Sequence, residues 1–217
     1  FVKKSDGDED LSQKISPVGE GIEPSDPQER YIEISELSSA SLAQRIAYLP
    51  QNKRTPDSGV LRMVLHGRFA YLKYPRRYRK EDYEMARKAL RWVGIEDLAE
   101  KNVNELSGGT RQKVYIAMAL AQDTDTILLD EPTTYLDIAH QIKMMKLARE
   151  LADNGKAVVM VLHDLVQGFQ TADKIVVMDN GKVKMVGTPD EIFLRAEELK
   201  ALSLGVPPAV DLAMKLR

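Results

Sequence analysis

Two adjacent acids, Asp130 and Glu131, follow a short apolar run and could together carry out phosphate chemistry. The run, TILL at residues 126–129, is typical of a strand buried on both faces of a parallel sheet, and Pro132 ends it. Acids at the carboxyl end of such a strand lie where open α/β sheets bind their ligands. One carboxylate can hold Mg²⁺, while its neighbour, on the other side of the backbone, can take a proton from water.

A glycine turn upstream of these acids, Ser107-Gly108-Gly109, predicts an anion site. Residues 112–121 carry apolar side chains at helical spacing, so we expect the glycine turn at a helix N-terminus. The unpaired N–H groups of a first helical turn and the positive end of the helix dipole attract anions. Phosphate is therefore the ligand class that suits both the glycine turn and the acid pair.

The strands and helices that would position these residues alternate along the chain. Short apolar runs predict compact buried strands at residues 46–49, 126–129 and 157–162. Partial alternation of apolar and polar residues predicts an edge strand at residues 31–35. The pattern of apolar side chains predicts helices at residues 41–45, 81–93, 112–121 and 141–152, and one that begins at Val60. Nearer the C-terminus, residues 179–181 predict a hairpin turn, and a capping box at Thr188 predicts a further helix. The fold class is therefore α/β, with a parallel sheet as its core.

Four strings in this sequence, in the same order and spacing, resemble the ATP-binding subunit of ABC transporters. They are LSGG at residues 106–109, LLDEP at 128–132, the Leu136-Asp137 pair, and VLHD at 161–164. The resemblance runs from about Ile46 to the C-terminus, and it is greatest to the importers of ferric siderophores, haem and cobalamin. It implies a P-loop-NTPase-like core with an inserted helical subdomain, ATP and Mg²⁺ as cofactors, and ATP hydrolysis coupled to import of a substrate such as an iron–siderophore.

The P-loop of that family, G-x-x-x-x-G-K-[ST], occurs nowhere in these 217 residues. Residues 1–30 are rich in Asp, Glu, Ser, Gly and Pro, which predicts a poorly ordered or truncated N-terminal segment and an ATPase core incomplete at that end. Losing two phosphate contacts of a few kcal/mol each weakens ATP binding by roughly a thousandfold. We therefore expect that this chain alone does not hydrolyse ATP.

The resemblance assigns roles around the acid pair. Asp130 and Gln51 would bind Mg²⁺, Gln51 would also contact the attacking water, and Glu131 would act as its general base. His163 would contact the γ-phosphate and hold water and base in line. A general base of this kind contributes about 10²–10⁴-fold to a rate.

The resemblance also implies a dimer in which two subunits meet head to tail. The glycine turn and Thr110, which stands where the family usually has glutamine, would bind the γ-phosphate of ATP held by the other subunit. Asp137 would lie at the dimer seam. His66 and His140 have no comparable context, so we expect them at the surface or in packing contacts.

Composition limits the possible partners and compartments. The net charge of −2 gives no case for non-specific nucleic-acid binding, and the basic, tyrosine-rich residues 71–80 are better explained as a solvated loop because acids follow at once. The absence of cysteine fits a reducing cytosol. No apolar run approaches the roughly 20 residues that span a bilayer, and no signal peptide opens the chain. Any membrane role must therefore come through a partner. The resemblance implies a cytoplasmic protein, peripheral at the inner face of the membrane through a transmembrane permease subunit, and paired with a second nucleotide-binding subunit as a homodimer.

The predicted organisation has four parts. They are an N-terminal segment at residues 1–30, an α/β ATPase core at 31–54 and 105–190, a helical subdomain at 55–104, and a C-terminal helical tail at 191–217. Two alternatives stay open, namely a non-hydrolysing or regulatory ABC-type remnant and a non-transport ABC ATPase. A DNA-maintenance ATPase needs a long coiled coil before LSGG, for which residues 51–106 are too few, and a ribosome-associated one usually carries two LSGG heads, whereas one occurs here.

Overall fold

The computed structural model describes residues 2–3, 31–32, 34–51, 56–134 and 136–205 of the chain. Most of the predicted N-terminal segment lies outside this part. Its residues Val2–Lys3 form a short strand, β1, antiparallel to β2, Tyr31–Ile32. The strand predicted at residues 31–35 is shorter than expected, because a 3₁₀ turn, η1, Ile34–Glu36, replaces its second half. The helix α1, Ser39–Ala43, follows, with Ser38 as its N-cap.

A three-stranded parallel sheet with the order β3-β4-β5 forms the α/β core, as predicted. The strands are β3, Ile46–Leu49, β4, Thr126–Asp130, and β5, Ala157–Val161. In the register of the sheet, Leu49 lies beside Leu129, and Asp130 lies beside Val161. The carboxyl ends of the three strands are therefore nearly level, so the residues that follow them share one edge.

The two faces of this sheet differ in burial. Ala47, Leu49, Ile127 and Leu129 share the face that packs into the main hydrophobic core, and each is at most 1% exposed. The prediction that residues 126–129 are buried on both faces is wrong for one face, because Thr126 and Leu128 are only half-buried. Val159 and Val161 of β5 are 50% and 47% exposed, because successive side chains of a strand point to opposite faces and the described residues cover mainly one of them.

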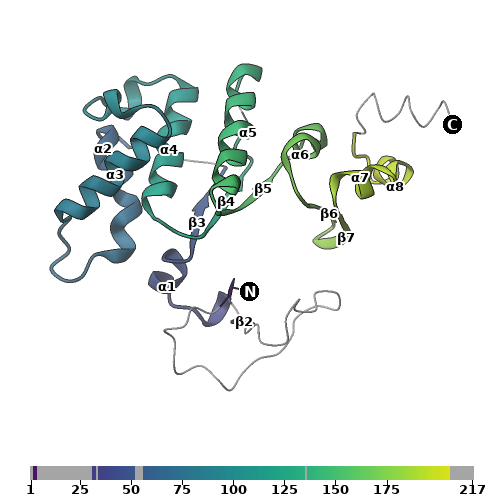
Figure 1. Cartoon of the computed structure of the whole chain (residues 1–217), viewed down its shortest axis with the longest axis horizontal. Coiled ribbons are helices and arrows are strands. Elements are labelled where there is room, and N and C mark those ends of the chain that lie inside the picture. The colour runs from purple at the N-terminus through teal and green to yellow at the C-terminus, as the bar shows by residue number, and fades with distance from the viewer. Residues whose placement is uncertain (1, 4–30, 33, 52–55, 135, 206–217) are drawn as a thin grey trace.

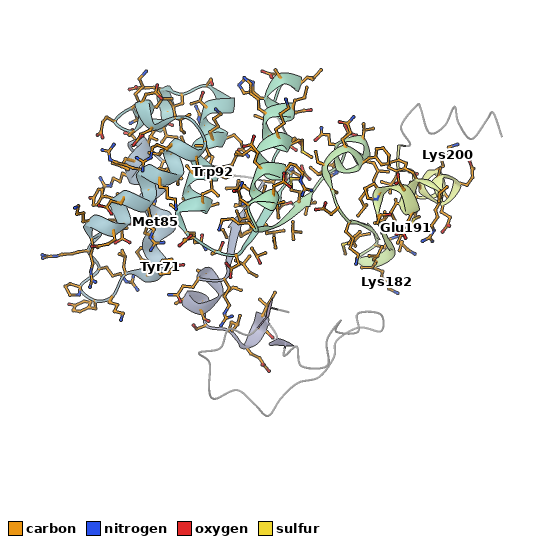
Figure 2. All side chains as sticks on the ribbon, in the orientation of Figure 1. Tyr71, Met85, Trp92, Lys182, Glu191 and Lys200 are labelled. Carbon is orange, nitrogen blue, oxygen red and sulfur yellow. The ribbon has the colours of Figure 1, made fainter. Side chains whose placement is uncertain are left out.

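A layer of helices packs on the buried face of the sheet (Figure 1). Its α-helices are α2 (Val60–Leu65), α3 (Lys80–Trp92) and α4 (Gly108–Ala121). Between them lie the 3₁₀ segments η2 (His66–Tyr71), η3 (Glu96–Leu98) and η4 (Val103–Glu105). Gly67 permits close contact between η2 and α4, because a Cβ there would lie 2.2 Å from the carbonyl oxygen of Met118. The helical character predicted for residues 55–104 is confirmed over the described part of that range, and Figure 2 shows Tyr71, Met85 and Trp92 distributed along this layer.

The C-terminal half continues with α5, Ile138–Asp153, beside the sheet and then α6, Leu165–Thr171. The predicted hairpin is confirmed as β6, Ile175–Asp179, and β7, Lys182–Gly187, with positive φ angles at Asn180 and Gly181 in its turn. The capping box at Thr188 begins α7, Pro189–Phe193, and α8, Ala196–Ala201, follows. These elements enclose a second hydrophobic cluster, formed by Ile175, Val177, Met185, Ile192, Phe193 and Leu199.

None of the helices in the described ranges is long and apolar enough to cross a membrane. The division of the chain into four parts stays a prediction. The main core joins residues of the predicted helical subdomain, such as Leu90, to residues of the predicted ATPase core, such as Leu129.

Candidate functional site

Three of the predicted site residues meet at the carboxyl edge of the sheet. Gln51 lies just after β3, Glu131 directly after β4, and His163 just after β5. The Gln51 Nε2 group donates a hydrogen bond to Glu131 Oε2, and His163 Nε2 contacts Glu131 Oε1. We call these three residues the strand-end cluster. Parallel strands in register produce this convergence, because the chain leaves each of them at the same edge.

The backbone and a hydroxyl group hold Glu131 in place. Its φ angle of +47° is uncommon for a residue other than glycine, and such conformations concentrate at functional sites. Its N–H donates to the Val161 carbonyl at 3.1 Å, which extends the β4–β5 pairing by one residue. The Thr134 hydroxyl donates to Glu131 Oε2 at 3.0 Å. The Glu131 side chain is consequently only 13% exposed, whereas that of His163 is 78% exposed.

Asp130 has a separate partner on the half-exposed face of the sheet. The Tyr48 hydroxyl donates to Asp130 Oδ2 at 3.1 Å. Tyr48 lies beside Leu128 in the sheet, so Asp130 is its diagonal neighbour on the same face. The hydrogen bond to Asp130 raises the pKa of the Tyr48 hydroxyl above its usual range, and desolvation and the negative charge of Asp130 add to this effect.

The residues at this edge fit Mg²⁺ in the form in which it accompanies a nucleotide. Mg²⁺ in proteins usually keeps several waters and binds one or two carboxylates together with substrate phosphates. Asp130 offers such a carboxylate, and Gln51 offers an amide oxygen, since its Nε2 faces Glu131. Within the described residues no group of three or more His, Cys, Asp or Glu side chains could hold a metal ion by itself. The donor set therefore suits a metal that the substrate helps to bind.

The glycine turn lies at a helix N-terminus, as predicted, and the helix begins earlier than the apolar pattern indicated. Ser107 is the N-cap of α4, and its Oγ accepts a hydrogen bond from the Thr110 N–H at 3.2 Å. The Thr110 hydroxyl lies 2.9 Å from the same Oγ. Ser107 and Gly108 are exposed, and nothing lies within 4 Å of the position that a Cβ of Gly108 would take. This open, exposed first turn fits an anionic ligand.

Asp137, the other residue predicted at the dimer seam, is the N-cap of α5. Its Oδ1 accepts a hydrogen bond from the His140 N–H at 2.8 Å, and His140 Nδ1 lies 2.8 Å from both carboxylate oxygens. The pKa of Asp137 is held below its usual range, first by the His140 N–H and then by the His140 ring. His140 was expected to lack a functional context, but it contacts a predicted site residue.

The structure does not bring the glycine turn and Thr110 into contact with Asp130 and the strand-end cluster. Within the described part of the chain, no hydrogen bond or ion pair links the glycine turn or Thr110 to Asp130, Glu131 or His163. Three neighbours of the predicted site residues were missed, namely Tyr48, Thr134 and His140. The sequence held only a weak signal for each, because a hydroxyl or an imidazole becomes informative only once its partner across the fold is known.

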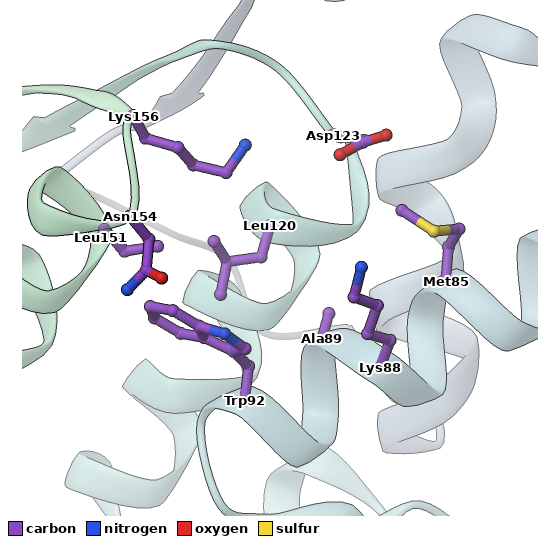
Figure 3. Close-up of a pocket in the computed structure, with 9 residues that line it drawn as sticks. All are labelled: Met85, Lys88, Ala89, Trp92, Leu120, Asp123, Leu151, Asn154 and Lys156. Carbon is purple, nitrogen blue, oxygen red and sulfur yellow. The ribbon is translucent and has the colours of Figure 1, made fainter.

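A pocket of about 140 Å³ lies at the opposite edge of the sheet, and Figure 3 shows the side chains that line it. Asp123 and Lys156 precede β4 and β5, whereas the strand-end cluster follows the strands. Trp92 of α3 and Leu120 of α4 form apolar walls, and Lys156 Nζ donates to the Thr124 carbonyl at 2.7 Å. None of the predicted site residues lines this pocket.

Known proteins resemble this chain in sequence. Residues 17–134, more than half of the chain, match the sequence model of the family described as ABC transporter. The chain is 44% identical over 163 residues to the achromobactin transport ATP-binding protein of Dickeya dadantii (strain 3937). The aligned region covers 74% of this chain and 61% of that protein. It is also 44% identical over 161 residues to the ferric enterobactin transport ATP-binding protein of Escherichia coli (strain K12). This alignment covers 73% of this chain and 59% of that protein.

A solved structure supports the same relationship. An inward-facing conformation of an ABC transporter matches with a TM-score of 0.68 and 32% identity, over 73% of this chain and 63% of the other. The chain spans about three fifths of the length of the curated relatives it matches. Sequence, fold and the four motifs agree, and the chain belongs to the ABC transporter family, as part of its ATP-binding domain.

Proposed function

We propose that this chain is part of the ATP-hydrolysing motor subunit of an ABC importer that takes up iron–siderophore complexes. The strand-end cluster carries the proposal, because it combines a restrained carboxylate with an amide and an imidazole at the edge where nucleotides bind. The relatives named for achromobactin and ferric enterobactin transport support the substrate class.

Glu131 acts as the general base on the attacking water. Gln51 and His163 contact its two carboxylate oxygens, and the Thr134 hydroxyl binds one of them, so rotation of the carboxylate is restricted. A restrained base needs little reorganisation when it takes the proton. Asp130 and Gln51 would hold Mg²⁺, which would supply positive charge near the phosphoryl group being transferred. The Tyr48 hydroxyl fixes the orientation of the Asp130 carboxylate.

A second nucleotide-binding subunit completes the site. The glycine turn and Thr110 of one subunit bind the γ-phosphate of ATP held by the other, because the open first turn of α4 is separate from the acids of its own chain. Asp137 lies at the seam between the subunits. A transmembrane permease subunit holds the pair at the inner face of the membrane, and the two copies are identical.

Uptake of radioactive iron–siderophore in cells that carry the gene tests this proposal. Glu131→Gln should reduce uptake by about 10²–10⁴-fold at unchanged protein level. Glu150→Gln is the matched control, because Glu150 is an exposed residue of α5 outside the site, and it should leave uptake unchanged. Wild-type uptake by Glu131→Gln would contradict the catalytic role. Unchanged uptake after deletion of the gene, or failure of the tagged subunit to copurify with an integral-membrane permease, would contradict the importer.

A further inference from the structure

His140 contacts two segments of one chain that the proposed function places at the subunit interface. The first contact is with Asp137, because His140 Nδ1 lies 2.8 Å from each of the two Asp137 carboxylate oxygens. The His140 side chain is half-buried, at 36% exposed, whereas the Asp137 side chain is exposed, at 66%. Because Asp137 also caps α5 through the His140 N–H, two hydrogen-bonding groups of the same histidine hold one carboxylate.

The second contact is between the His140 ring and the backbone of the glycine turn. A Cβ built on Gly109 would lie 2.1 Å from His140 Cδ2, 2.5 Å from Nε2 and 2.8 Å from Cγ. Real Cβ atoms do not approach other atoms so closely, so the ring occupies the space that any side chain at residue 109 would need. The neighbouring Gly108 has no atom within 4 Å of the corresponding position. The close approach is therefore specific to Gly109 and His140.

We propose that His140 is a positioning residue that joins Asp137, the N-cap of α5, to the glycine turn within one chain. Asp137 and the glycine turn are then presented to the second subunit as a single unit. This inference rests on the proposed function, since that function gives the two segments a common partner. His140 Nδ1 binds the carboxylate, and the rest of the ring packs on Gly109. A change in the position of Asp137 is thus transmitted to the first turn of α4.

A helix cap alone does not account for this arrangement. The backbone N–H of residue 140 would satisfy the Asp137 carboxylate with almost any side chain at that position. Asp164 illustrates the simpler case. It caps α6 by accepting from the Val166 N–H at 2.9 Å, and in the described part of the chain Val166 gives it no second hydrogen bond. The ring contact with Gly109 is the additional feature, and it links helices α4 and α5 rather than neighbouring residues of one helix.

Thermal unfolding of four variants of the 217-residue chain tests the ring contact. Gly109→Ala should lower Tm by about 4 °C or more, because the new methyl group displaces the ring. The same substitution in a His140→Ala background should lower Tm by less than half as much. Gly108→Ala should change Tm little or raise it. Equal losses from Gly109→Ala in both backgrounds would overturn the contact.

Amide hydrogen exchange tests the coupling itself. Asp137→Ala should speed exchange at Thr110 and Arg111 by roughly fivefold when His140 is present, which is the change that a typical N-cap contact produces. In a His140→Ala background, Asp137→Ala should not change exchange at these two residues. In a His140→Asn background, which keeps a donor near the carboxylate, Asp137→Ala should speed exchange by part of that amount. Asp164→Ala is the matched control and should not change exchange at Thr110.

These outcomes are independent of ATP, so they separate the inference from the proposed function. If Asp137→Ala leaves exchange at Thr110 and Arg111 unchanged, or changes it equally without His140, the positioning role is overturned even if uptake depends on Glu131. If the coupling is measured while uptake is unaffected by Glu131→Gln, the proposed function fails and the positioning role of His140 stands.

Discussion

Asp82→Ala should be among the most destabilising single substitutions in the helical layer. Asp82 lies in the first turn of α3 and is 7% exposed. Its Oδ1 accepts from Arg68 Nε at 3.1 Å, and its Oδ2 accepts from the Arg79 N–H at 2.9 Å. Arg68, whose side chain is 12% exposed, also donates from Nη1 to the Ala121 carbonyl at 3.0 Å, at the C-terminal end of α4. Removing the carboxylate therefore leaves a largely buried guanidinium without its counter-charge.

The expected loss follows from this burial. Breaking a buried ion pair by removing one partner costs about 3–5 kcal/mol, because the remaining charge stays desolvated. For a chain of this size each kcal/mol corresponds to about 2–4 °C, so Tm should fall by about 6–20 °C. Replacing both partners, as Arg68→Met with Asp82→Leu, should recover most of the loss, since well-packed apolar pairs are often as stable as the ion pair they replace.

Urea unfolding followed by tryptophan fluorescence measures this effect directly. Trp92, the only tryptophan of the sequence, lies on α3 and therefore reports on the helical layer. Asp97→Ala is the matched control, because Asp97 is exposed in η3, and it should change stability by less than about 0.5 kcal/mol. A loss below about 1 kcal/mol for Asp82→Ala, or a double variant no more stable than Asp82→Ala alone, would refute the reasoning from desolvation.

Three further predictions concern the candidate site. Thr134→Val should reduce iron–siderophore uptake at least about tenfold at constant protein level, because a hydrogen bond to charged Glu131 is lost. Tyr48 should titrate above its ordinary value of 10.0 in an alkaline absorbance titration, and Asp130→Asn should bring it back. The raised pKa means that this contribution to stability is present below pH 10.0 and is lost as pH rises through the folded-state pKa. The purified 217-residue chain alone should show no ATP turnover, because it contains no P-loop motif; turnover abolished by Glu131→Gln would contradict this.

The resemblance predicted the members of the strand-end cluster, and the topology of the sheet explains why they meet. Once residues 126–129 and 157–162 are recognised as neighbouring parallel strands, the residues that follow them must share one edge of the sheet. Glu131 and His163 do so, and Gln51 joins them after β3. The hairpin at Asn180-Gly181 was predictable for a local reason, since these residues tolerate the positive φ angles of a tight turn.

The remaining features depend on packing that the sequence does not reveal. Tyr48 reaches Asp130 only because the register places Tyr48 beside Leu128, and a shift by one residue would move it to the other face. The start of α4 was missed because glycine is a poor helix former, so the apolar pattern became visible only after the capped first turn. The role of His140 was missed because its ring contact depends on the distance between two helices that are far apart in sequence.

The two ends of α4 explain why a contact as small as that of His140 matters. At its C-terminal end, Gln122 Nε2 donates to the carbonyl of Ile46 at 3.0 Å, and the Tyr71 hydroxyl donates to the carbonyl of Gln122 at 2.8 Å. This end is thereby fastened to both the sheet and the helical layer. The 14 residues of α4 extend about 21 Å from there to the glycine turn. Toward the N-terminus, Gln112 Nε2 donates to the carbonyl of Pro132 at 3.2 Å, and Val114 is fully buried. The contact between His140 and Gly109 therefore acts on the first turn of α4, where we propose that the phosphate binds.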